Sequence, residues 1–350
     1  MMNFKTWATV VIAFILCSLM LTEPAFALTC DMNQYTVTPI TGSTIDYGDT
    51  QWPIGSIKIS DPFGSRELTK NANNNNYDLH RGLDLQEEKG IPVYAIADGK
   101  VTKIQHDCCK DRGDCPNPIS NCSFPDGGNV VVIEHSLSST TKFNLNDQSF
   151  SKYYSIYSHL DDFKKDDMGG MLTTGTITKG SRIGSVGSID ANYAHLHLET
   201  RVGTTCSGES QLKPQSSCFQ TPAIDPSVHP FYFLDYVNGI YNENNNYDIC
   251  VTKSSNLQVT FESSRDELDF NEIEVVYPEG TKKINFSTKA GIKLANVDEN
   301  PYDSVEIIPS DFKSNTEKYT IKFNFTNLTD FNEINVRDIW GNGKKIVPNP

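Results

Sequence analysis

Residues 192–200 read NYAHLHLET, a stretch that places two histidines two positions apart between leucines. In a β-strand, successive side chains point to opposite faces of the sheet. His195, His197 and Glu199 therefore share one face, whereas the two leucines face the other way, toward a core. The pattern predicts a strand that brings two imidazole rings to one small volume. A polar outer face that merely contains histidine is the alternative.

Short β-strands are the pattern of the whole chain. Runs such as NVVVIEH (129–135) and YYSIYSHL (153–160) are rich in β-branched and aromatic residues, and clusters of Gly, Asn, Asp and Pro separate them. Helical periodicity is hard to find. The 350 residues suffice for two domains with a sizeable core. We therefore expect an all-β, antiparallel protein.

Two Asn-rich stretches, KNANNNNYD (70–78) and YNENNNYD (241–248), indicate polar loops, and the second suggests a domain boundary. We expect a first domain over residues 28–244 and a second over 245–350. The second alternates at period two with regular turn residues, which fits a small β-sandwich. It contains no histidine and, after Cys250, no cysteine. It therefore offers no metal or nucleophile constellation, and its role stays open.

Residues 1–27 have the form of a secretory signal: one lysine, an apolar run and an Ala-Phe-Ala end. Cleavage after Ala27 would release an exported protein, secreted or periplasmic, with no stable membrane insertion. An uncleaved anchor helix and a lipoprotein acylated at Cys30 are the alternatives. No later segment is apolar enough to span a bilayer.

Eight cysteines remain beyond the signal, and an even number in an exported chain predicts disulfides, whose pairing spacing alone does not fix. The formal net charge of −14 at pH 7 repels phosphates, so we expect no nucleic-acid partner.

The stretch LHRGLDL (79–85) holds a second chemical signal, His80 and Asp84. Four strand residues span roughly 13 Å at about 3.3 Å each, which is too far for two ligands of one zinc ion at about 2.0–2.2 Å. A bend at Gly82 would bring them together, because a kink or bulge is easily formed at glycine. A surface histidine beside an unrelated aspartate is the alternative.

Considered together, these segments predict a catalytic zinc site with three protein ligands and an open fourth position. His80, Asp84 and one of His195 and His197 would be the ligands. The other histidine and His159 would flank the open position, where a neutral imidazole takes a proton from water or stabilises an oxyanion.

The ordered motifs HRGLD, YSHL and HLHLE resemble those of the lysostaphin-type (LytM-like) zinc metalloendopeptidases. The surrounding sequence also resembles that family's motifs. The segments FGSR, GIPVYAIADGKVTKI, GGNVVVIEH, TKGSRIGSVG and AIDP occur in the family's order. The resemblance covers roughly residues 55–235. It implies an antiparallel β-sheet groove domain of the duplicated-hybrid-motif type.

The resemblance also implies roles for single residues. Zn²⁺ would be held by His80, Asp84 and His197, and the catalytic histidines would be His159 and His195. Tyr157 and Arg66 lie at motif positions that would line the groove. His135 also matches a family position, but it ends a strand, so we expect it to be structural. Glu199 shares the histidine face and would orient a ring. These last four residues complete the expectations for the site.

The activity implied by the resemblance is that of a secreted zinc metalloendopeptidase, which hydrolyses peptide cross-links of peptidoglycan by attack of zinc-bound water. Its partner would be peptidoglycan or another peptide substrate. Insertions at 105–128, after His135 and after the last motif depart from the family pattern, and such loops decide which peptide fits. The alternatives are a non-catalytic cell-wall-binding or amidase-activating module of the same fold, and a peptidase acting on extracellular protein.

Overall fold

The computed structural model describes residues 31–42, 46–55, 57–61, 63–71, 74–108, 127–145, 148–203, 227–234, 247–253, 256–263, 270–285, 304–308, 319–325 and 328–350. These residues form antiparallel β-strands and one short 3₁₀ helix, η1 (Pro230–Tyr232), so the all-β prediction is confirmed. Within these ranges no helix has the length and apolar character needed to cross a membrane. The predicted signal at 1–27 lies outside the described residues.

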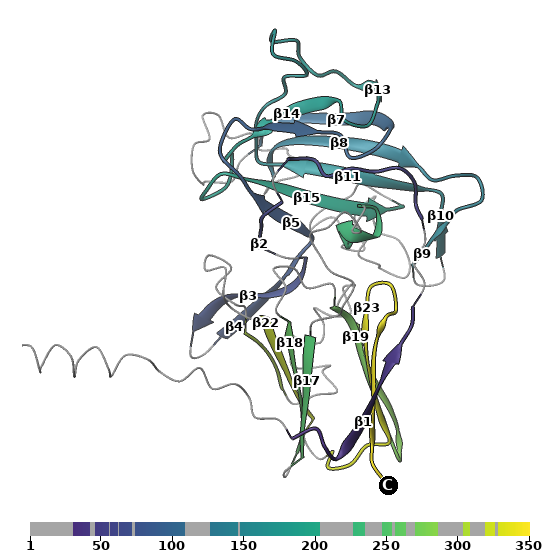
Figure 1. The fold of residues 1–350 in the computed structure, drawn as a ribbon. Coiled ribbons are helices and arrows are strands. Elements are labelled where there is room, and N and C mark those ends of the chain that lie inside the picture. The colour runs from purple at the N-terminus through teal and green to yellow at the C-terminus, as the bar shows by residue number, and fades with distance from the viewer. Residues whose placement is uncertain are drawn as a thin grey trace, which may run out of the picture.

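A large sheet carries the motif segments (Figure 1). Its neighbouring strands are, in order, β13 (Gly175–Ile177), β7 (Gly99–Cys108), β8 (Gly128–Ser136), β11 (Lys152–Ser158), β15 (His195–Val202), β5 (Gly82–Gln86) and β2 (Ile59–Asp61), and β16 (Ser227–Val228) also pairs with β15. Strand β15 lies between β11, which pairs with residues 197–202, and β5, which pairs with residues 195–199.

A three-stranded sheet packs against one face of the large sheet. It consists of β12 (Leu160–Asp162), β14 (Arg182–Val186) and β6 (Pro92–Tyr94). Apolar side chains of both sheets join in one buried cluster, which includes Val93 and Ile183 from the small sheet and Leu196 and Leu198 from β15. The leucines of the opening stretch therefore face this core, and the histidines between them face away from it.

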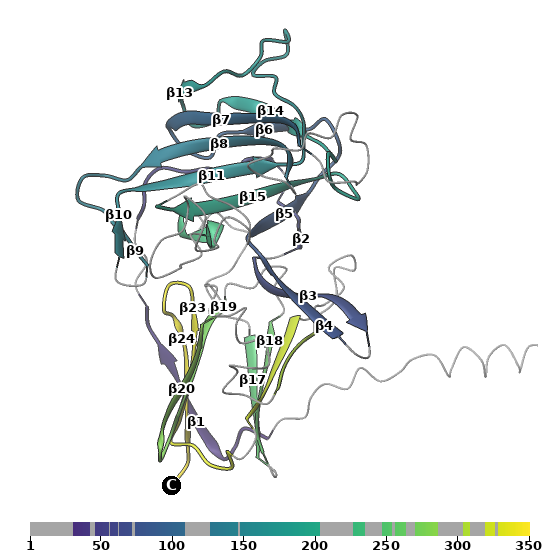
Figure 2. The same ribbon diagram turned by 180° about the vertical axis from the view of Figure 1, so that it is seen from behind.

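Two further sheets form a sandwich (Figure 2). One contains β1 (Tyr35–Ile40), β24 (Gly343–Pro348), β23 (Glu333–Asp338), β19 (Phe270–Tyr277) and β20 (Gly280–Asn285), and the other β17 (Tyr247–Lys253), β18 (Leu257–Ser263), β22 (Tyr319–Phe325) and β21 (Ser304–Ile308). Buried residues such as Val259 and Val336 join the two layers in a second core.

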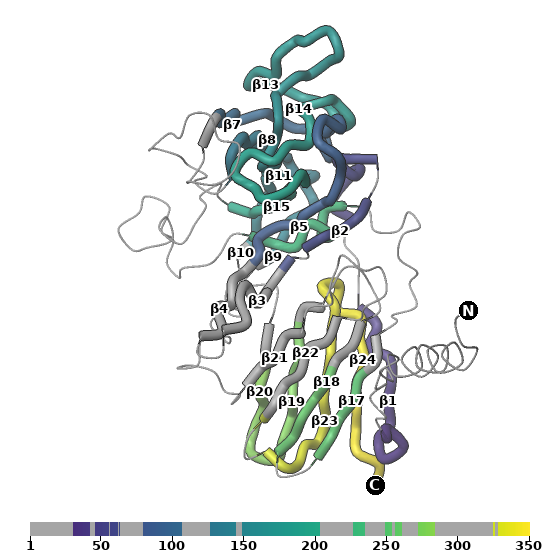
Figure 3. Tube along the Cα trace, turned by 90° about the vertical axis from the view of Figure 1, so that its left-hand side faces the viewer, coloured from purple at the N-terminus to yellow at the C-terminus, as the bar shows by residue number. Residues whose placement is uncertain are grey.

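The domain boundary at residue 244 stays a prediction, and the strand pairing amends it at one place. Strand β1, which the boundary assigns to the first domain, pairs with β24 along its whole length, and Tyr35 is buried in the second core. Figure 3 shows β1 beside the C-terminal strands. The short strand YTVTPI carries no local signal that names its partner, so the sequence did not reveal this pairing.

The turn between β23 and β24 joins the first core. Ile339 is buried there, and Trp340 packs against the same cluster. The Gly42 backbone N–H donates to Asn342 Oδ1 at 2.9 Å, and a side chain at Gly42 would clash with the backbone of this turn. Residues near the C-terminus therefore stabilise the part of the chain that holds the motifs.

Two hairpins complete the fold: β3 (Gly64–Asn71) with β4 (Asn74–His80), and β9 (Phe143–Leu145) with β10 (Gln148–Phe150). The prediction that 70–78 forms a polar loop is therefore wrong, since Asn74–Asp78 pair within β4. Asparagine has low β-propensity, but the antiparallel partner β3 satisfies the backbone and overrides that preference.

Candidate metal centre

The centre is built on the polar face of β15. His197 pairs across the sheet with Asp84 of β5, and Glu199 pairs with Gly82. His80 ends β4, and the chain turns at Arg81 before β5 begins at Gly82. This break in the extended backbone brings His80 and Asp84 together, but it lies at Arg81 and not at Gly82, where it was predicted. Gly82 instead begins β5, and it is needed because a side chain there would lie 2.9 Å from the His197 ring.

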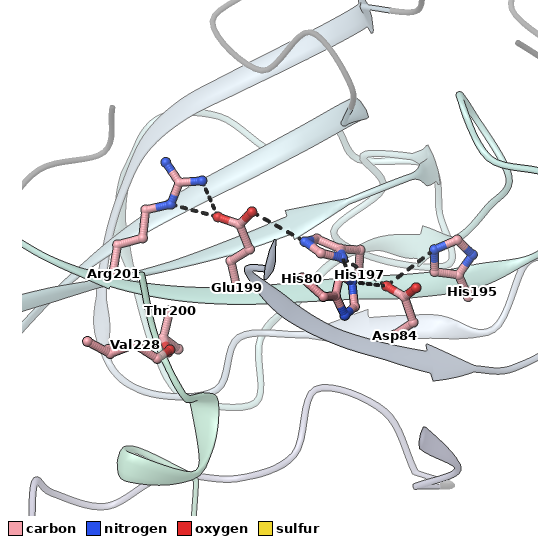
Figure 4. A network of polar contacts seen from close by, with 8 residues as sticks. All are labelled: His80, Asp84, His195, His197, Glu199, Thr200, Arg201 and Val228. Atoms are coloured by element: carbon pink, nitrogen blue, oxygen red, sulfur yellow. Dashed lines mark hydrogen bonds and ion pairs between the residues drawn. The ribbon is translucent and has the colours of Figure 1, made fainter. Parts of the chain in front are cut away.

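Three atoms that could ligate a metal ion converge at this place (Figure 4). Nδ1 of His197 lies 2.8 Å from Oδ1 of Asp84 and 3.1 Å from Nε2 of His80, and the last two atoms are 3.2 Å apart. Ligands of a tetrahedral zinc ion stand about 3.4 Å from one another, given metal–ligand bonds near 2.1 Å. Two imidazoles and one carboxylate at nearly that spacing fit a zinc ion.

The electrostatics of the cluster favour positive charge. Burial raises the pKa of Asp84, but the neighbouring His80 and His197 rings outweigh that effect and hold its pKa well below the usual range. Burial lowers the pKa of His197, yet its contacts with Asp84 and Glu199 raise it to about 9. A cation shared by these groups, whether proton or metal, is therefore stabilised here.

His159 and His195 stand beside the three ligand candidates. Their ring centroids are 4.8 Å apart, and the His159 ring is 5.9 Å from that of His197. Nδ1 of His159 lies 2.8 Å from the Ile189 carbonyl oxygen, and Nδ1 of His195 lies 3.0 Å from that of Tyr193. A carbonyl only accepts, so Nδ1 carries the proton in both rings and Nε2 is left as the base.

Backbone geometry and burial set the state of these two rings. His159 has a φ of 62°, unusual outside glycine, and its N–H donates to the Gly127 carbonyl at 2.8 Å. This turn at the end of β11 aims the ring across the strand ends. Burial lowers the pKa of His159 to about 3, and burial also lowers the pKa of His195. Both rings are therefore neutral near pH 7.

Glu199 and Arg201 extend the cluster along β15. Oε1 of Glu199 lies 3.3 Å from Nε2 of His197, and Nε of Arg201 donates to Oε2 of Glu199 at 2.6 Å. Burial raises the pKa of Glu199, but Arg201 and His197 outweigh it and hold that pKa at about 2. The expected contact of Glu199 with a ring is present. Arg201 was missed, although continuing the period-two alternation two residues further would have found it.

Three other predicted residues lie elsewhere. Tyr157 does not line a groove: it is fully buried on the opposite face of β11, where its hydroxyl accepts from the Ile96 N–H at 3.0 Å. His135 has the structural place expected of it, with Nδ1 2.8 Å from the Asp98 carbonyl and Nε2 2.7 Å from Ser155 Oγ. The side chain of Arg66 lies outside the described residues.

Comparison with known proteins finds one family. Residues 78–211 match the model of peptidase family M23. No curated protein matches the chain. This matched range contains all five histidine and aspartate positions of the cluster.

Solved structures are also similar to the chain. A zinc-containing peptidase from Vibrio cholerae is 22% identical over 46% of this chain, with a TM-score of 0.29, and the match covers 37% of that protein's length. LytU, whose structure has been solved, is 21% identical in sequence, with a TM-score of 0.29; the match covers 45% of this chain and 80% of the LytU chain. The catalytic domain of lysostaphin from Staphylococcus simulans is 17% identical over 57% of this chain and 92% of its own, with a TM-score of 0.26.

Proposed function

We propose, from the match of residues 78–211 to the model of peptidase family M23, that the chain is a zinc-dependent endopeptidase that hydrolyses peptide cross-links of peptidoglycan. His80, Asp84 and His197 would hold the ion. When bound, zinc would supply Lewis-acid chemistry that polarises the scissile carbonyl and activates a water molecule.

The observation that supports this proposal is the convergence of two kinds of group at one place. Three donor atoms stand 2.8–3.2 Å apart, and two imidazoles with proton-free Nε2 atoms lie beside them. A purely structural zinc site is closed by four protein ligands. Three ligands with two neighbouring bases instead suit a site that keeps a position for substrate.

We assign the proton transfers to His159 and His195. Because both Nδ1–H groups are held by backbone carbonyls, each ring can rotate little, and the two ring centroids lie 4.8 Å apart. Either ring would accept a proton at Nε2 from the attacking water. The imidazolium formed in this way would stabilise the oxyanion of the tetrahedral intermediate and return that proton to the leaving amine. The same two histidines would thus act at both ends of the reaction.

The remaining expectations belong to this proposal. Residues 1–27 would be a cleaved signal, and the protein would act outside the cytoplasm, secreted or periplasmic, with disulfides among its eight mature cysteines. Cys250, the one whose side chain the structure describes, is buried in β17. The C-terminal sandwich would be a packing or binding unit.

The test uses the mature chain, residues 28–350, because Ile339 and Trp340 belong to the first core. Purified protein should contain about one zinc ion per chain, release soluble muropeptides from sacculi, stop in chelator and recover with added zinc. His197→Ala should abolish the activity. His106→Ala is the matched control, since His106 contacts Phe163 and none of the cluster.

Two outcomes would replace the proposal. A protein that binds sacculi, contains no zinc and cleaves nothing would be a non-catalytic wall-binding or amidase-activating module. A zinc enzyme that cleaves a glycine-rich protein such as elastin but leaves sacculi intact would act on extracellular protein. Undiminished hydrolysis by His197→Ala would refute the metal site itself.

A further inference from the structure

A chain of polar contacts continues from His197 into the interior of the sheet (Figure 4). His197, Glu199 and Arg201 lie at every second position of β15, so their side chains share one face of the strand and each contacts the next. Glu199 and Arg201 are both buried, and Arg201 has only 1% of its surface exposed. A charge at such depth is stable only when it is paired.

The two nitrogens of the His197 ring have different partners. Nδ1 faces Asp84 Oδ1 and His80 Nε2, whereas Nε2 lies 3.3 Å from Oε1 of Glu199. An ionised carboxylate only accepts, so a hydrogen bond here requires the proton on Nε2. The lone pair of Nδ1 is then directed at the other two ligand atoms.

The two oxygens of Glu199 are divided in the same way. Nε of Arg201 donates to Oε2 at 2.6 Å, and an Nη nitrogen of Arg201 contacts the same oxygen. Oε1 is left for His197. Arg201 therefore fixes the orientation of the carboxylate, and the carboxylate fixes the orientation and the tautomer of the ring.

We propose that Glu199 and Arg201 are a positioning pair that holds His197 as an Nδ1 metal ligand, and that this pair sets the affinity of the centre for zinc. The inference rests on the proposed function, because it takes His197 to be a zinc ligand. Neither residue touches substrate. Partners of this kind, outside the ligands themselves, typically contribute 10–100-fold to metal affinity.

The test measures zinc affinity by competition with a chromophoric chelator, and the visible absorption of the Co²⁺-substituted protein as a report on ligand geometry. Glu199→Ala should weaken zinc binding roughly 10–100-fold and alter the cobalt spectrum. Glu199→Gln keeps an acceptor oxygen but loses the charge, so its loss of zinc affinity should be smaller than that of Glu199→Ala. Arg201→Met should resemble Glu199→Gln, since the carboxylate stays but is no longer fixed.

The matched control is Glu272→Gln. Glu272 is a buried glutamate whose Oε1 accepts from Nη1 of Arg337 at 2.9 Å, and it lies on β19 in the sandwich. Its loss should reduce stability without changing zinc affinity. If Glu199→Ala does not fold, Glu199→Gln decides the question. Wild-type affinity and an unchanged cobalt spectrum in folded Glu199 variants, or an equal loss in Glu272→Gln, would overturn the positioning pair.

The same measurements separate this inference from the proposed function. A wild-type protein that binds no zinc contradicts the proposed function and the pair together. A wild-type protein that binds zinc and cleaves sacculi, while Glu199→Ala retains full affinity, contradicts the pair alone.

Discussion

Gly82→Ala should damage the metal centre although it adds one methyl group. Gly82 lies on β5 opposite Glu199, and the His197 ring occupies the space beside it. An added Cβ would lie 2.9 Å from Cε1 and Nε2 of His197, and closer still to the Leu198 carbonyl oxygen. The carbonyl belongs to β15, which is paired on both sides, so it has little freedom to move.

The size of the effect follows from these contacts. Ordinary van der Waals contact begins at 3.4 Å, so the ring must retreat by about 0.5 Å and the two strands must separate by more. Overpacking of this kind costs about 1–3 kcal/mol of stability. Asp84 moves with β5 and His197 with β15, so the ligand triangle opens, and a misplacement approaching 1 Å costs roughly 100-fold in rate.

The assay compares Gly82→Ala with Gly55→Ala. A Cβ at Gly55 meets nothing within 4 Å, so this control changes only the glycine itself. Urea unfolding gives the free energy of unfolding, chelator competition gives the zinc affinity, and muropeptide release gives the rate. We expect losses in all three for Gly82→Ala alone. Equal zinc affinity and rate in the two variants would refute the packing argument.

Three further predictions address residues away from the ligands. Burial lowers the pKa of His135 from 6.5 to about 4. As the pH falls, His135 is therefore protonated in the unfolded protein before it is protonated in the folded one. The free energy of unfolding should fall by about 3 kcal/mol between pH 6.5 and pH 4. Urea titrations of His135→Gln should lack this component of the pH dependence. Ile339→Ala should lower the stability of the first core by about 2–5 kcal/mol, seen in urea unfolding, despite its place in the C-terminal turn. Tyr157→Phe leaves the buried Ile96 N–H without its acceptor, so the free energy of unfolding in urea should fall by about 1–3 kcal/mol. The KM for muropeptides should stay unchanged. A raised KM would show that Tyr157 contacts substrate after all.

The alternation of residues predicted the strand faces well. The leucines and histidines of β15 lie on opposite faces, as the alternation predicts. One face packs on a core, so a shift of the strand register by one residue would expose the leucines. A break between His80 and Asp84 was also predictable, since two side chains four residues apart cannot meet on a straight strand, but it lies at Arg81 and not at Gly82. Both predictions rest on local geometry, which the sequence carries directly.

Long-range partners were not predictable in the same way. Tyr157 was placed in a groove from its motif position, although its alternation with Ser158 sets it on the core side of β11. The partner of β1 depends on which edge of the sandwich is free, and nothing within residues 35–40 encodes that. The contact of Arg201 with Glu199 follows from spacing, but its deep burial depends on the strands around it.

The pairing of β1 with β24 fixes an order of events during synthesis. Tyr35 leaves the ribosome long before its partner Pro348 is made, because the two residues lie far apart in the chain. Until then β1 has an open edge with unpaired backbone groups, and the sandwich lacks one of its border strands. Closure must therefore wait until β24 has been made, and a nascent chain that stalls before β24 keeps an unpaired strand that can pair with other chains.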